Sequence, residues 1–312
     1  MRCTSCRWTE VVTALLLCTS PLARAESPPL PTPTLLLELD GRVYPSHEEG
    51  MTGFALARLR PGLAYAPTAW LDAKVVVELA GEQPEVLDAL VRFLPHADLA
   101  IEVGLGKPPL FFTHREPTTQ AIFTDVTAVA RALRINRDLG VTVDYTPTCL
   151  PLEVAARVSN GSSSATLNDN SELAYTLALD LVLPAQHRGA RAPLGLRIGV
   201  AGTYESAEDR LGITGRTELG FSYFRAPIVS GSRWVGETHA ALQLDALHLL
   251  VEAGLASEAR SRDDDGNPTT PRRALPASLS YGLSSELGWT FGDTTTTRVG
   301  SVDLALRVER LW

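Results

Sequence analysis

The sequence predicts an all-β protein, a transmembrane antiparallel β-barrel of about 14 strands, within a range of about 12 to 16. From residue 52 onward, segments with an apolar side chain at every second position recur between polar or glycine-rich turns. In segment 71–80, for example, Leu71 and Val75 would face one way, and Asp72 and Glu78 the other. These segments fit a tilted bilayer-spanning strand of about 9 to 11 residues better than a soluble sandwich strand of about five or six.

The N-terminus is typical of a secretory signal peptide. Arg2 and Arg7 form a basic start, residues 11–17 a short apolar run, and Ala23-Arg24-Ala25 a cleavage site. A lipoprotein with Cys18 as the lipidated residue is the alternative, but Leu17 stands where a small residue would be expected. We therefore expect a signal peptide over residues 1–25, a proline-rich periplasmic lead over 26–34 and a barrel domain over 35–312.

The expected strands follow one another along the barrel domain with no convincing domain boundary. They fall at 35–43, 53–65, 70–80, 86–94, 98–106, 139–145, 152–158, 173–183, 194–205, 213–224, 233–244, 247–259, 277–290 and 298–310. Some turns between them are tight and others long and hydrophilic, as at the two ends of a barrel.

One gap between expected strands is exceptional. Residues 107–138 show no strand alternation, and the alanine- and valine-rich stretch 124–133 predicts a short helix. Loops of this length are uncommon unless they have a function or are disordered. We expect this segment to fold into the lumen of the barrel.

The charge balance is acidic. Removal of residues 1–25 takes away three arginines and one glutamate, which leaves 25 basic and 35 acidic residues. A nucleic-acid partner would require a basic stripe, so none is expected.

Several segments resemble the phosphate-selective porin O/P family in their order along the chain. They are segment 54–63 with Arg58 and Arg60, segment 103–110 with Gly106-Lys107-Pro108, the re-entry 137–141, the turn Asn160-Gly161 and the late strand 302–310. The resemblance implies an outer-membrane porin that passes anions such as phosphate and associates as a homotrimer. The chain resembles a short or C-terminally truncated member, because family members continue beyond the segment that resembles 302–310.

The basic residues on the expected lumen wall and the long loop are the candidate anion pathway. They are Arg58, Arg60, Lys74, Lys107, Arg115, Arg131, Arg134 and Arg137. Such a cationic ladder could replace part of an anion's hydration shell. In the alternative interpretation these side chains pair with lumen carboxylates such as Asp72, Glu78 and Glu102 and brace the wall.

The predicted barrel domain contains none of the common short motifs for catalysis or metal binding. The sequence has no G-x-S-x-G elbow, no H-E-x-x-H helix and no phosphate-binding loop. The six histidines are scattered, although His239 and His248 lie on neighbouring expected strands. We therefore expect no enzyme, no catalytic residues, no metal and no cofactor.

Together these patterns predict a porin of the cell outer membrane, in contact with outer-membrane lipid, through which small hydrophilic solutes diffuse passively. Anions such as phosphate are the favoured solutes. A non-conducting structural or adhesive barrel is the second hypothesis, and a soluble periplasmic β-protein is the third.

Overall fold

A computed structural model of the chain describes residues 30–42, 52–81, 83–116, 123, 126–162, 168, 170–183, 194–211, 228–244, 246–262, 273–291 and 302–312. The predicted signal peptide, residues 26–29 of the predicted lead and the expected strand 213–224 lie outside these residues.

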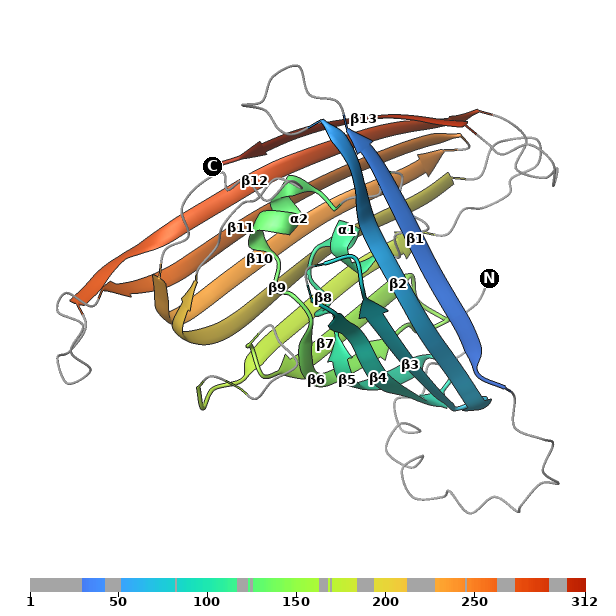
Figure 1. Cartoon of the computed structure of the whole chain (residues 1–312), viewed down its shortest axis with the longest axis horizontal. Coiled ribbons are helices and arrows are strands. Elements are labelled where there is room, and N and C mark those ends of the chain that lie inside the picture. Colours follow the sequence, from blue (N-terminus) through green and yellow to red (C-terminus); the bar gives the residue numbers. More distant parts are fainter. Residues whose placement is uncertain are drawn as a thin grey trace, which may run out of the picture.

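The described residues form thirteen strands and two short helices (Figure 1). The strands are β1 (Thr32–Arg42), β2 (Gly53–Thr68), β3 (Leu71–Glu78), β4 (Glu85–His96), β5 (Leu99–Gly106), β6 (Asp138–Tyr145), β7 (Leu152–Ser159), β8 (Ala174–Leu183), β9 (Leu194–Leu211), β10 (Ile228–Leu244), β11 (Leu247–Arg262), β12 (Arg273–Phe291) and β13 (Val302–Leu311). The helices are α1 (Phe112–Arg115) and α2 (Ala128–Leu133).

All thirteen strands belong to one sheet, and each pairs antiparallel with its neighbours in sequence. This is the strand order of an up-and-down barrel, so the predicted all-β class is confirmed, with thirteen described strands. The described pairings do not include one between β1 and β13. Strand β1 begins at Thr32, inside the predicted lead, and β9 pairs directly with β10 out to Leu211 and Ile228.

The sheet is apolar on its outer face and polar on its inner face. Strand β8 shows this most clearly, because Leu177 and Leu179 are exposed while Thr176 and Asp180 are buried. A soluble sandwich would bury the leucines instead. The alternation predicted from the sequence is therefore present with the polar side directed inward.

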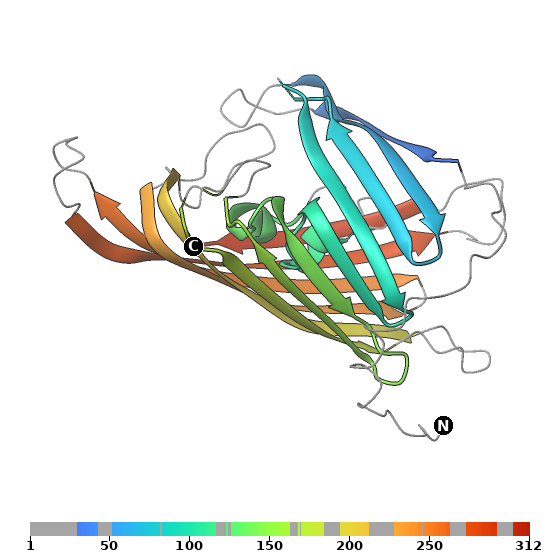
Figure 2. The same cartoon turned by 90° about the horizontal axis from the view of Figure 1, so that it is seen from below.

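The segment between β5 and β6 carries both helices and lies on the concave side of the sheet (Figures 1 and 2). Helix α2 lies within the stretch for which the sequence predicts a helix, and it contacts β11, β12 and β13. Its residues Val129, Ala130 and Leu133 are fully buried. The expected inward folding of this segment is thus observed. Among the described residues, neither helix combines the length and the apolar character needed to cross a membrane.

Candidate functional site

The inward segment packs on the wall through a small apolar core. Leu110, Phe111, Val129 and Leu133 are fully buried and belong to one cluster with wall residues of β8, β9, β10 and β11. They come close because the wall has glycine here: a Cβ built on Gly254 would lie 2.8 Å from the Phe111 ring. The segment therefore sits directly on the inner surface of β11.

Carboxylates of the wall hold the backbone of the segment. Glu237 of β10 accepts hydrogen bonds from the backbone N–H groups of Phe111 and Phe112, at 3.2 and 3.1 Å. Glu252 of β11 accepts from the Thr113 N–H at 3.1 Å and from the Thr127 hydroxyl at 2.5 Å. Phe111 has a φ of 61°, in the region that non-glycine residues rarely adopt. These bonds fix an unusual conformation at the start of α1.

Further anchors secure the C-terminal part of the segment. The guanidinium of Arg233 in β10 contacts Glu205 at 2.5 Å and Glu258 at 2.9 Å, and it donates to the Leu133 carbonyl at 3.2 Å. The buried Asp138 side chain accepts from the Leu139 N–H at 3.0 Å and also from the backbone of Gly161. Acidic side chains on the inner wall are thus used to hold the segment in place.

Among the predicted anion-pathway residues, the two arginines of β2 are paired with carboxylates. Arg58 contacts Glu38 of β1 at 2.5 Å, and Arg60 contacts Glu78 of β3 at 2.6 Å. The expected role of Glu78 as a partner for a wall cation is observed.

Two more predicted cations share one carboxylate. Asp88 of β4 contacts Lys74 at 2.9 Å and Arg137 at 2.7 Å, which links the wall to the end of the inward segment. One carboxylate between two cations leaves positive charge in excess.

Two predicted cations have no carboxylate within ion-pair distance among the described residues. Lys107 donates to the His114 carbonyl at 2.7 Å, and Arg134 donates to His114 Nδ1 at 3.1 Å. Burial, together with the charges of neighbouring arginines that include Arg60 and Arg137, lowers the pKa of Lys107 to about 8. Such a lysine is still charged at neutral pH but is close to titrating.

Arg134 is the centre of this group of positive charges. Burial and the charges of Arg131, Arg137, Arg58 and Arg60 together lower its pKa to about 10. We call Arg58, Arg60, Lys107, Arg131, Arg134 and Arg137 the cationic cluster. Six of the eight residues proposed from the sequence therefore act on one another, although they come from β2 and both halves of the inward segment.

His114 is a member of this site that sequence reasoning missed. Because arginine can only donate, His114 Nδ1 accepts from Arg134 and the ring proton must lie on Nε2. Nε2 is buried without a hydrogen-bond partner among the described residues. Burial and the charges of Arg134, Lys107 and Arg137 hold the pKa of His114 well below its ordinary value, so the ring is a neutral donor beside the cluster. A lone histidine in a loop has no sequence signal for this role.

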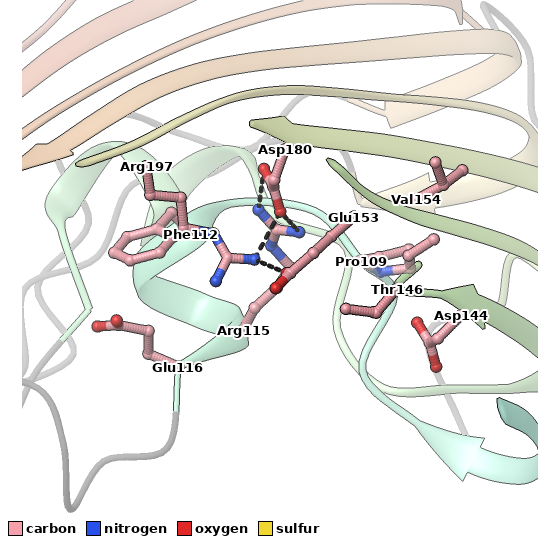
Figure 3. A pocket seen from close by; sticks show the side chains of 11 residues that line it. Pro109, Phe112, Arg115, Glu116, Asp144, Thr146, Glu153, Val154, Asp180 and Arg197 are labelled. Carbon is pink, nitrogen blue, oxygen red and sulfur yellow. Dashed lines mark hydrogen bonds and ion pairs between the residues drawn. The ribbon is translucent and has the colours of Figure 1, made fainter. Parts of the chain in front are cut away.

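Arg115, the eighth predicted residue, lies apart from the cluster. Its guanidinium binds Asp180 of β8 through two hydrogen bonds of 2.9 and 3.1 Å. Asp180 also contacts Arg197 of β9 at 2.7 Å, and Arg197 contacts Glu153 of β7 at 2.5 Å. This network borders a cavity of about 290 Å³ between α1 and the wall of β6 to β9 (Figure 3).

A buried histidine connects this network to the anchors of the inward segment. His239 Nδ1 lies 2.6 Å from Glu237 and its Nε2 lies 3.3 Å from Asp180. The ring stacks on Phe112 at a centroid distance of 4.7 Å. An imidazole between two carboxylates can hold or transfer a proton.

No family model matches the chain, and no curated protein matches it. Solved structures of OmpT, an outer membrane protein of Vibrio cholerae, are similar. A form lacking loop L8 has a TM-score of 0.40 and 9% identity, with 91% of this chain and 97% of that chain covered. The in-vitro folded protein has a TM-score of 0.40, 11% identity and coverage of 91% and 95%. A trimer form has a TM-score of 0.38, 11% identity and coverage of 91% and 97%.

One sequence-based prediction is corrected. The absence of local motifs led us to expect no enzyme, but the interior holds His239 between the carboxylates of Asp180 and Glu237. Motif searches read single segments, whereas these residues come from two strands, β8 and β10. The prediction that the chain is not an enzyme is therefore withdrawn.

Proposed function

We propose that the protein is an outer-membrane β-barrel that lets small anionic solutes diffuse through its lumen past the cationic cluster. The observation that carries the proposal is the state of Lys107 and Arg134. Both are surrounded by other cations and lack a carboxylate partner among the described residues, although carboxylates are abundant in the interior. A cation that only needs to brace a wall would be expected to have such a partner.

The outer face of the sheet supports a location in a membrane. Large apolar side chains are exposed along the strands, including Leu177, Val200, Leu255 and Leu283. A contiguous apolar face of this extent is rare on a soluble protein. Trp234 and Trp289 are also exposed, as aromatic residues at a membrane interface would be. The outer membrane is the membrane in which such barrels occur, and the predicted signal peptide agrees with export to it.

The inward segment gives a physical reason for anion preference in an acidic protein. On the side that packs against the wall, the carboxylates of Glu237 and Glu252 and the Glu205–Arg233–Glu258 group are already bonded to the segment or to each other. Its other side presents Lys107 and Arg134, which can donate hydrogen bonds to an anion that has lost part of its water. Charges at close range in a narrow passage are weakly screened, so their local sign outweighs the net charge of the chain.

The proposal is tested by single-channel recording of the detergent-purified protein in planar bilayers under a potassium chloride gradient. Steady openings with an anion-shifted reversal potential are expected. The Lys107→Gln and Arg134→Gln double variant should move the reversal potential toward cations, more than Arg58→Gln with Arg60→Gln, because the latter pair already has carboxylate partners.

Arg260→Gln is the matched control, since Arg260 donates only to the Pro276 carbonyl in the described structure. Equal selectivity in the control and in the Lys107 and Arg134 variant would refute the assigned role of the cluster. Block of the channel current by added phosphate tests whether phosphate is the anion, as the family resemblance implies. The mass of the protein in detergent tests whether it forms a homotrimer.

A non-conducting structural barrel is the second candidate. It is favoured by the complete burial of Leu110, Phe111 and Leu133, which shows that the inward segment fills part of the interior with close packing. A folded barrel that changes gel mobility on heating but carries no current would establish this reading in place of the first.

A further inference from the structure

The cavity beside α1 differs in charge from the cationic cluster. It is lined by Arg115, Glu116, Asp144, Glu153, Asp180 and Arg197, together with Phe112, Thr146 and the apolar residues Pro109, Val154 and Ala155 (Figure 3). Its volume of about 290 Å³ is near the lower end, about 300 Å³, of the range for small-molecule sites.

The two arginines of this cavity are already neutralised. Arg115 binds Asp180 with two hydrogen bonds, and Arg197 contacts both Asp180 and Glu153. The charges of these four side chains therefore sum to zero.

Two carboxylates remain outside that network. Glu116, at the end of α1, and Asp144, near the end of β6, are half-buried, and their carboxyl groups make no hydrogen bond or ion pair among the described residues. Figure 3 shows them on opposite sides of the Arg115–Asp180–Arg197 network. Partly desolvated carboxylates without partners are costly, and a cationic group placed beside each of them would offset that cost.

We propose that this cavity binds a small organic dication, with one ammonium or guanidinium group held by Glu116 and a second held by Asp144. Pro109, Val154 and Ala155 offer apolar contact to the carbon skeleton of such a ligand. The Phe112 ring already receives one cation in the cavity, since the Arg197 guanidinium carbon lies 5.5 Å from its centroid.

The lining is less suited to a metal ion. The described residues contain no group of three or more histidine, cysteine, aspartate or glutamate side chains arranged to hold one. An organic cation needs fewer ligands and makes use of the apolar lining. The inference does not depend on conduction, because a plugged barrel could bind the same ligand.

The test is isothermal titration calorimetry of the full-length detergent-folded protein with 1,4-diaminobutane. Saturable binding is expected for the diamine, weaker binding for propylammonium, which has a single ammonium group, and none for propionate. The variants Glu116→Gln and Asp144→Asn, which keep side-chain size, should each weaken diamine binding at least fivefold. Glu172→Gln is the matched control, because Glu172 is exposed and lies outside the cavity.

The ionisation of Glu116 adds a second readout. Burial, with the charges of Glu286 and Glu252, raises the pKa of Glu116 to about 7 against the lowering effect of the Arg197 and His239 charges. The carboxylate must be ionised to hold a cation, so diamine affinity should increase between pH 6 and pH 8. This increase should be smaller in Glu116→Gln.

Each outcome decides the proposal. All variants must first show the heat-dependent gel mobility of the folded parent. Absence of saturable amine binding would overturn the proposal, and so would equal diamine binding by a variant that combines Glu116→Gln with Asp144→Asn and by the Glu172→Gln control. Displacement of the amine by millimolar magnesium chloride would overturn it in favour of a metal site. Binding with no channel current would support the cavity while refuting anion conduction, which separates the two proposals.

Discussion

The contact between the inward segment and strand β11 leads to a sharp prediction about Gly254. A Cβ at this position would lie 2.8, 2.9 and 3.0 Å from side-chain atoms of Phe111, Val129 and Leu133. Ordinary carbon contacts are about 3.5 to 4.0 Å, so all three side chains would have to move. Overpacking of this kind costs about 1 to 3 kcal/mol. The Gly254→Ala variant should therefore be destabilised.

Gly236 provides a matched control on the neighbouring strand β10. A Cβ built on it meets nothing within 4 Å. Replacement of glycine by alanine also restricts the unfolded chain, which stabilises by about 0.4 to 1 kcal/mol where the backbone tolerates it. Because both substitutions share this effect, the difference between Gly254→Ala and Gly236→Ala isolates the steric cost and should be about 1 to 3 kcal/mol.

The assay is equilibrium unfolding in urea of the protein folded into lipid vesicles, followed by tryptophan fluorescence and by gel mobility. The Gly254→Ala midpoint should lie below that of the parent, and the Gly236→Ala midpoint at or above it. Equal midpoints for the two variants would refute the packing of the segment on β11, and with it the position of the cationic cluster.

Two further predictions concern the ends of the inward segment. Because the pKa of Lys107 is about 8, below its ordinary value, its charge is present below that pH and is lost as the pH rises through it. The anion preference measured from reversal potentials should therefore decrease between pH 6.5 and pH 9, and Lys107→Gln should remove most of this change; a pH-independent preference in the parent would contradict the assignment. At the other end, Asp138→Ala should destabilise the protein by about 3 kcal/mol, because buried donors such as the Leu139 and Gly161 N–H groups lose their acceptor. Asp138→Asn, which keeps an acceptor oxygen, should lose less stability in the same urea titration, and equal losses would show that these hydrogen bonds do not matter.

Most of the described strands and the inward segment could be predicted from the sequence. A strand has a side-chain period of two, so alternation in a segment such as 71–80 can be read without knowing its neighbours. The break in that alternation after Gly106 likewise marked the segment that leaves the wall, and the alanine-rich stretch within it marked α2. The basic residues of the candidate anion pathway could also be named, because they stand at polar positions of the alternating strands or within the segment that interrupts the alternation.

Which charges meet could not be predicted from the sequence, because it depends on the tertiary structure. Arg115 and Asp180 are 65 residues apart, and the Phe111 N–H group and Glu237 are 126 residues apart. Arg115 and Arg134 both belong to the inward segment, yet one joins the wall network and the other the cationic cluster. No local pattern encodes such partners, because they depend on the register of distant strands and on where the segment rests on the wall. The neutral state of His114 has the same origin, since burial and neighbouring charges arise only when the chain has folded.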